Sequence, residues 1–381
     1  GFPISDAHVV EVFTGAYKRG QLEVNNRVQM INKRLKIVHS MSCGIMMTLV
    51  KGSAESRKAV VRWFADTLLV NDSAEAYQPD PTKTAAPEFL MNVGVALLYL
   101  AMPIVRDESK LSKIDASSFL SSQAAIQDLF PKDTTMLIAK DASAADNGEA
   151  EGGERKEGGG GGAGIGAEES KAEGVTFAEL KSFTTQAFFA CWRGLHLGLV
   201  QVMGRHKRLH QNLGHLQRMM GGPGNPNPDA MAEGQFNALF IRKMAAEVVI
   251  MDSEILSDCL LFMVRAGSWL TEIVSKEAGV PIDSSEHESG ASGINGLPQG
   301  SLVWQLPEHL IDDILELILF LTRFHPSTLG TTQLYPLMTM VVFFLAHPSL
   351  VRSPHLRAKL GDVLYTAFLP PSHREEENFH G

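Results

Sequence analysis

The sequence is short of cysteine, of strand-like patterns and of long apolar runs. Only three of its 381 residues are cysteine, at Cys43, Cys191 and Cys259. They stand far apart in apolar helical surroundings, which disfavours a disulfide framework and fits a reducing compartment. The longest apolar run, residues 337–346, is about half of the roughly 20 residues that a membrane-spanning helix needs. No stretch has the pattern of a secretory signal or transit peptide, so we expect no membrane contact.

Positive charge is also scarce. The formal net charge is −9, from 34 Lys and Arg against 43 Asp and Glu, and this balance disfavours a nucleic-acid-binding groove, which needs a basic face. The acidic excess is concentrated in one segment. Residues 141–175 contain nine acidic and three basic residues, a net charge of −6, which leaves −3 for the remainder of the chain.

The same segment, residues 141–175, holds eleven of the 34 glycines and few apolar residues. Such a composition cannot bury enough apolar surface to offset the entropy lost on ordering, so it predicts a disordered acidic insert. Residues 158–166 contain a G-x-G-x-x-G match. It follows no predicted strand and opens no apolar helix, so we interpret it as linker sequence and not as a phosphate cradle. Two further loops are predicted at residues 221–234 and 284–300.

Deleting residues 141–175 is expected to leave the fold intact, because a glycine-rich acidic segment buries little apolar surface. The thermal midpoint of the deletion variant, measured by circular dichroism, should lie within a few degrees of the parent value. A loss of cooperative melting would show that the segment packs against the rest of the protein.

Apolar residues recur at helical spacing along most of the chain. Residues 307–324 are the clearest case, with apolar positions at i, i+3 or i+4, and i+7 and acidic residues on the other face, the pattern of an amphipathic helix. The apolar positions are Leu310, Ile311, Ile314, Leu317, Ile318 and Leu321. The same reasoning predicts helices over residues 24–40, 56–70, 87–103, 176–217 (one helix or a pair), 236–251 and 252–274.

Proline marks several ends of these helices. Pro326 and Pro348 are predicted to end the helices before them, because proline cannot continue a helix and disfavours helical backbone in the residue before it. Ser353 followed by Pro354 reads as an N-cap and a first helical position. Short two-faced helices joined by tight breaks must stack to hide their apolar stripes. We therefore predict an all-α fold over residues 1–381, an elongated armadillo- or HEAT-like α-solenoid.

One group of histidines could bind a metal. His206 and His210 lie at i, i+4, with His215 nearby. No carboxylate or cysteine stands at ligand spacing, and the flanking Arg205 and Lys207 would repel a cation. We interpret this group as a solvated basic helix face and predict no metal site.

Neither a thiol nor a carboxylate pair gives a convincing catalytic site. Cys191 lies five residues before His196, but it is embedded in an apolar helix and we interpret it, like the other two cysteines, as a buried structural residue. Asp312, Asp313 and Glu316 form an acidic helix face, which we interpret as solvated because acid–base work requires a pocket that separates the pKa values. We predict no catalytic, cofactor-binding or metal-ligating residue, and no cofactor.

Several segments carry a more specific pattern. In chain order they are Pro87-Glu88-Phe89-Leu90-Met91-Asn92, Leu97-Leu98-Tyr99-Leu100-Ala101-Met102-Pro103, Lys113-Ile114-Asp115, Phe188-Phe189, Leu195-His196-Leu197-Gly198-Leu199, Cys259-Leu260, Trp269-Leu270, Leu306-Pro307-Glu308, Asp312-Asp313, His325-Pro326, Pro354-His355-Leu356 and Ala358-Lys359-Leu360. Together they resemble the core of the ubiquitin chain-elongation factors, large ubiquitin ligases that end in a U-box. The resemblance spans about residues 87–365; residues 1–86 share only its helical character.

The resemblance implies an armadillo-like superhelix and an activity that extends ubiquitin chains on substrates already carrying ubiquitin, for proteasomal degradation. The U-box would hold a charged ubiquitin-conjugating enzyme without a covalent intermediate on the ligase. Other implied partners are ubiquitinated substrates and a segregase ATPase of the AAA type, in cytoplasm and nucleus. No U-box pattern occurs in this sequence, so we expect a scaffold fragment that is itself inactive. The alternatives are a generic armadillo or HEAT adaptor without a ubiquitin role, and a cysteine-thioester ligase, which needs a reactive thiol.

Overall fold

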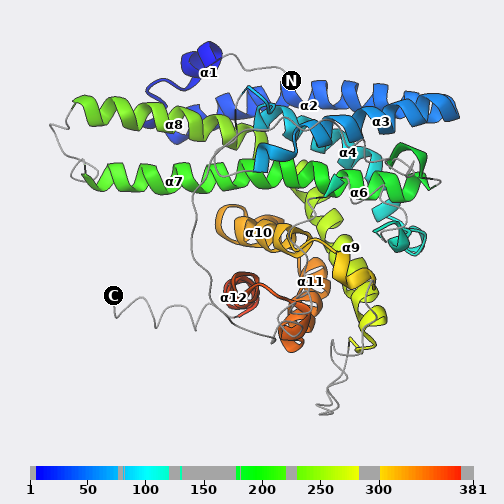
Figure 1. Ribbon diagram of the computed structural model, residues 1–381. Helices are drawn as coiled ribbons and strands as arrows, with labels where there is room; N and C mark the ends of the chain where they lie inside the picture. Colours follow the sequence, from blue (N-terminus) through cyan, green and yellow to red (C-terminus); the bar gives the residue numbers. More distant parts are fainter. Residues whose placement is uncertain are drawn as a thin grey trace, which may run out of the picture.

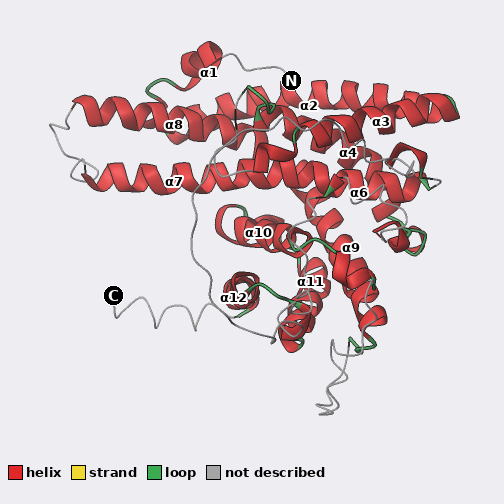
Figure 2. Cartoon of the chain, in the orientation of Figure 1, coloured by secondary structure: helices red, strands yellow, loops and turns green. Residues whose placement is uncertain are grey.

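The computed structural model describes residues 6–75, 80, 82–119, 129–130, 177–180, 182–219, 230–282 and 301–369. Over these ranges the protein is built from helices and contains no β-strand, which confirms the all-α prediction (Figure 2). The predicted insert at 141–175, its G-x-G-x-x-G match and the predicted loop at 284–300 lie outside the described residues. The predicted loop at 221–234 lies outside the described residues as far as residue 229 and is wrong for residues 230–234, which begin a helix.

The helices follow one another as labelled in Figure 1. Their bounds are α1 Asp6–Phe13, α2 Gln21–Gly52, α3 Ala54–Val70, α4 Pro87–Val105, α5 Glu108–Leu111, α6 Phe183–Leu195, α7 Gln201–Met219, α8 Ala230–Ile250, α9 Ser253–Ala278, α10 His309–Phe324, α11 Thr331–Ala346 and α12 Pro354–Val363. Two π-helical segments, His196–Val200 and Leu364–Phe368, extend α6 and α12. The first of them joins α6 to α7 without a break, so within the predicted region 176–217 the residues from 183 onward form one continuous helical segment, preceded by a separate 3-10 turn at Phe177–Glu179.

Two groups of helices are visible in Figure 1. In the first group α6 and α7 lie end to end, α3, α4 and α8 pack along them, and α2 packs on α3, α4 and α8. Helices α9 to α12 form the second group beside it. Helix α4 packs against α6 and α9, and α10 and α11 both pack against α12. A continuous cluster of buried apolar residues runs through both groups. A smaller cluster joins α1 and the start of α2 to α8.

The helix ends agree with local chemistry. Asp252 accepts hydrogen bonds from the backbone N–H of Glu254 and Ile255, at 3.0 and 3.2 Å, and caps α9. Ser353 caps α12 in the same way, through the N–H of Leu356. Helices α10 and α11 end two residues before Pro326 and Pro348, which confirms both predicted stops.

The helix predicted over residues 87–103 does not end at Pro103. This proline lies in the last turn of α4, which continues to Val105. The missing N–H of proline removes only one helical bond there, and the N–H of Arg106 still reaches the carbonyl of Met102 at 3.0 Å.

Helix α4 is the most apolar long helix of the protein. It carries a longer uncharged stretch than residues 337–346, and by length and composition alone it could cross a membrane. Of its most apolar window, however, 72% is buried inside the protein. Such burial is typical of a core helix in a packed domain.

Glycines allow α4 to approach α6 and the π-helical turn closely. A Cβ atom added to Gly94 would lie 2.9 Å from the carbonyl oxygen of Gly194 on α6. One added to Gly198 would lie 2.7 Å from the carbonyl oxygen of Leu90. These backbones are therefore in contact with no side chain between them, an approach that only glycine permits.

Candidate functional site

Helix α10 presents a buried apolar stripe and a covered acidic face. Leu317 and Ile318 are fully buried, as the helical spacing predicts. The acidic face, Asp312, Asp313 and Glu316, is not the solvated surface that the sequence suggested. Asp313 has no exposed surface, and Glu316 keeps 19% of its side-chain surface. The reason is that α12 and α7 bring lysines onto Asp312 and Glu316, whereas Asp313 lies against His196.

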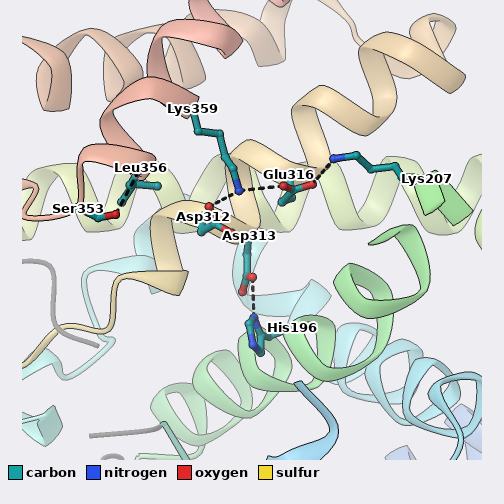
Figure 3. Close-up of polar contacts among 8 residues, drawn as sticks. All are labelled: His196, Lys207, Asp312, Asp313, Glu316, Ser353, Leu356 and Lys359. Carbon is teal, nitrogen blue, oxygen red and sulfur yellow. Dashed lines mark hydrogen bonds and ion pairs between the residues drawn. The ribbon is translucent and has the colours of Figure 1, made fainter. Parts of the chain in front are cut away.

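Two lysines bind the outer carboxylates of this face (Figure 3). Lys359 on α12 donates to Glu316 Oε1, with its Nζ atom 2.8 Å away, and also to Asp312. Lys207 on α7 reaches the other oxygen of Glu316 at 2.9 Å. Glu316 therefore joins helices from three distant parts of the chain.

These contacts shift the pKa values of the partners apart. Burial by itself would raise the pKa of Glu316, but the hydrogen bonds and charges of Lys359 and Lys207 outweigh it and lower that pKa. Burial would likewise lower the pKa of Lys359, whereas Asp312 and Glu316 raise it above the usual value. Both groups thus stay charged near neutral pH, which makes this network a structural clamp and not a proton-transfer pair.

Asp313 points away from the lysines to His196, at the start of the π-helical turn (Figure 3). Its Oδ1 atom lies 2.6 Å from Nδ1 of His196. Burial raises the pKa of Asp313, and the charge and hydrogen bond of His196 offset this only in part. A carboxyl group of raised pKa against a histidine is the kind of arrangement that functional sites use. The contact also explains why Asp313 can be buried.

A second histidine, His309, completes this cluster. It lies four residues before Asp313 on α10, and its ring centroid is 4.4 Å from that of His196. Phe130 stacks on His309 at 5.3 Å. Burial lowers the pKa of His309 well below its usual value, and the charges of His196 and Arg193 add to this. In the described part of the chain, His196, His309 and Asp313 are the group whose donor atoms come close enough to share a metal ion, all lying within 4.8 Å of one another.

The histidines singled out from the sequence lie elsewhere. His210 and His215 are exposed on α7, as expected for a solvated face. For His206 this interpretation is wrong: it is fully buried, and its Nε2 atom lies 3.0 Å from Glu247 Oε1 on α8. Its ring also packs edge-on to Phe324, with the centroids 4.7 Å apart. His206 therefore serves to join α7 to α8 and α10.

All three cysteines are buried, as predicted. Burial raises the pKa of Cys43 to about 11 and raises that of Cys191 and Cys259 further above the usual value. A thiol of raised pKa with no access to solvent is a poor nucleophile, because the thiolate is the reactive form.

A hollow of about 530 Å³ lies between residues 112–117 and the end of α9. Lys113, Asp115, Lys276 and Glu277 are among its lining residues. Because the lining carries both signs of charge, it favours neither an anion nor a cation, and the polar cluster on α10 remains the better defined site.

Comparison with known proteins identifies the family. The family described as the ubiquitin elongating factor core matches residues 2–381. The chain belongs to this family. The match includes residues 2–86, where the sequence alone showed only helical character. It therefore extends the resemblance to the N-terminal region.

Individual relatives agree with this assignment to the elongating factor core. The chain is 25% identical over 374 residues to the "Probable ubiquitin conjugation factor E4" of Arabidopsis thaliana, covering 93% of this chain and 34% of the relative. It is 26% identical to "Ubiquitin conjugation factor E4 A" of Mus musculus over 196 residues, which cover 50% of this chain and 18% of that protein. A 60-residue stretch is 40% identical to "Ubiquitin conjugation factor E4" of Schizosaccharomyces pombe. This stretch covers 16% of this chain and 6% of that protein.

This elongating factor core spans about a third of the length of the Arabidopsis relative. None of the described residues forms a catalytic constellation of the kind a ligase with a covalent intermediate needs, since every cysteine is buried. The described residues form a large apolar core, with hydrogen-bonded ion pairs that join its helices.

Proposed function

We propose that this chain is the scaffold and partner-binding core of a ubiquitin chain-elongation factor, which extends ubiquitin chains on substrates that already carry ubiquitin. The observation that carries the proposal is the family match over residues 2–381. The burial of all three thiols supports a scaffold that holds other proteins rather than one that carries ubiquitin itself.

We further propose that its helices are part of an armadillo-like solenoid. Support comes from the second group of helices, in which α9 packs against α11 and α12 packs against both α10 and α11. Pairing of near neighbours in the chain is the contact pattern of stacked helical repeats.

The remaining parts of the proposal concern the whole protein. Its ligase activity would come from a U-box that holds a charged ubiquitin-conjugating enzyme. Its partners would be that enzyme, ubiquitinated substrates and a segregase ATPase of the AAA type, in cytoplasm and nucleus. Membership in a family whose relatives are named as ubiquitin conjugation factors supports partners in the ubiquitin pathway in general.

A reconstituted ubiquitination assay tests the proposal. The natural protein that contains this chain should lengthen ubiquitin chains on a ubiquitin-fused substrate in the presence of activating enzyme, conjugating enzyme, ubiquitin and ATP. The 381-residue chain alone should add nothing above background, because these residues show no U-box pattern and every thiol is buried, so none can carry ubiquitin itself.

Two outcomes would contradict the proposal. Chain growth by the isolated chain that is lost in Cys191→Ser would show a thioester ligase. A natural protein that binds partners but never lengthens a chain would show an adaptor without a ubiquitin role.

A further inference from the structure

The cluster of His196, His309 and Asp313 joins the two groups of helices. His196 lies at the first position of the π-helical turn between α6 and α7, whereas His309 and Asp313 lie on α10. The i, i+4 spacing puts the two α10 residues on one face of the helix. π-Helical turns are rare and often occur at functional sites.

Two buried polar atoms of the cluster lack a hydrogen-bond partner in the part of the chain that the structure describes. Nε2 of His309 and Oδ2 of Asp313 are buried and have no hydrogen-bond partner among the described residues. Asp313 itself has no exposed surface. Buried polar atoms are almost always satisfied, so two orphans within one small cluster require an explanation.

We propose that His196, His309 and Asp313 bind a Zn²⁺ ion. Two imidazole nitrogens and one carboxylate oxygen are ordinary zinc ligands, and three protein ligands leave a fourth position for water. The ion would satisfy both orphaned atoms at once. If His196 ligates through Nδ1, that atom gives up its proton and its hydrogen bond to Oδ1 of Asp313, so the carboxylate must present both oxygens to the ion.

The distances permit this with small movements. The donor atoms lie within 4.8 Å of one another. In tetrahedral coordination at about 2.1 Å they would stand about 3.4 Å apart, so the most distant pair must close by at most about 1.4 Å. A change of this size is of the order that rotation about side-chain bonds supplies.

The surrounding charges also permit a cation. Arg193 is the cation whose charge reaches both His309 and Asp313. It forms an ion pair with Asp72, which balances its charge. Phe130 covers the ring of His309 and limits the access of water. The ion would thus tie α10 to the α6–α7 segment from inside the core, independently of the proposed ubiquitin role.

Metal titration of the purified chain tests this proposal. After removal of metal by a chelator, Zn²⁺ should bind with one-to-one stoichiometry in isothermal titration calorimetry, with a Kd in the micromolar range or below, and should raise the thermal midpoint. Co²⁺ should give visible d–d bands of the intensity typical of four-coordinate cobalt.

His309→Ala should weaken Zn²⁺ binding by at least about 100-fold, since even partners outside the ligand set change affinity by 10–100-fold. Asp313→Asn, which preserves side-chain shape, should weaken it as well and serves if the alanine variant is poorly folded. His210→Ala, at an exposed histidine on α7, should leave binding unchanged. The proposal is overturned if the parent chain shows no one-to-one binding and no cobalt bands, or if binding survives both cluster substitutions.

Discussion

Gly198→Ala is expected to destabilise the protein by roughly 3 kcal/mol or more, at the upper end of the cost of overpacking a core. The new Cβ atom would lie 2.7 Å from the carbonyl oxygen of Leu90 and 2.8 Å from Cα of Met91. Both are backbone atoms of α4, which cannot rotate aside as a flexible side chain can. The helices would have to separate where the core is fully buried. Urea unfolding followed by circular dichroism measures the change.

Gly214→Ala is the matched control. Gly214 lies inside α7, and a Cβ atom added there would meet nothing within 4 Å. Alanine is the better helix former by about 0.8–1 kcal/mol, so this variant should be as stable as the parent or more so. Equal effects of the two substitutions would show that α4 and the π-helical turn are not in backbone contact.

Leu317→Ala is expected to reduce the free energy of unfolding by about 2–5 kcal/mol, the cost of a cavity in a packed core. Leu317 is fully buried on the apolar stripe of α10. Leu22→Ala, at a leucine of α2 that is 75% exposed, should change stability by about 0.5 kcal/mol or less. The same unfolding measurement compares the two. A Leu317 variant as stable as the Leu22 variant would mean that the stripe of α10 does not face the core.

Helices and their ends could be predicted because their signals are local. The spacing of Leu310, Ile314 and Leu317 lies within three turns of one helix, and capping by Asp252 or Ser353 involves residues two or three positions away. Such interactions are decided by nearby residues whatever the rest of the chain does. The error at Pro103 has the same origin, since a proline in the last turn costs less than one in the interior.

The polar cluster could not be predicted because its members are far apart in sequence. His196 and Asp313 are separated by 117 residues, so no residue pattern within a single helix could reveal their contact. One signal was present. Asp313 stands three residues after Leu310 and four before Leu317, so it borders the apolar stripe, unlike Asp312 and Glu316. A carboxylate in such a position predicts a buried polar partner.

The burial of His206 was missed for a related reason. Its basic neighbours in the sequence suggested a solvated face, but neighbours in sequence point in different directions on a helix. Residues at helical spacing from it, Met203, Leu209 and Leu213, are all buried, and they were the better guide to the side on which His206 lies.

The burial of α4 has a consequence for the newly made chain. Its apolar surface is covered by α6, which ends roughly 90 residues after α4 does. At about 5–20 residues per second of synthesis, α4 waits roughly 5–20 s before that partner has been translated, and longer before α9 follows. Among the described helices that pack closely on α4, α2 and the short α5 are the ones made before α6. Much of the apolar surface of α4 should therefore stay exposed on the newly made chain during this interval, and we expect chaperones to bind it.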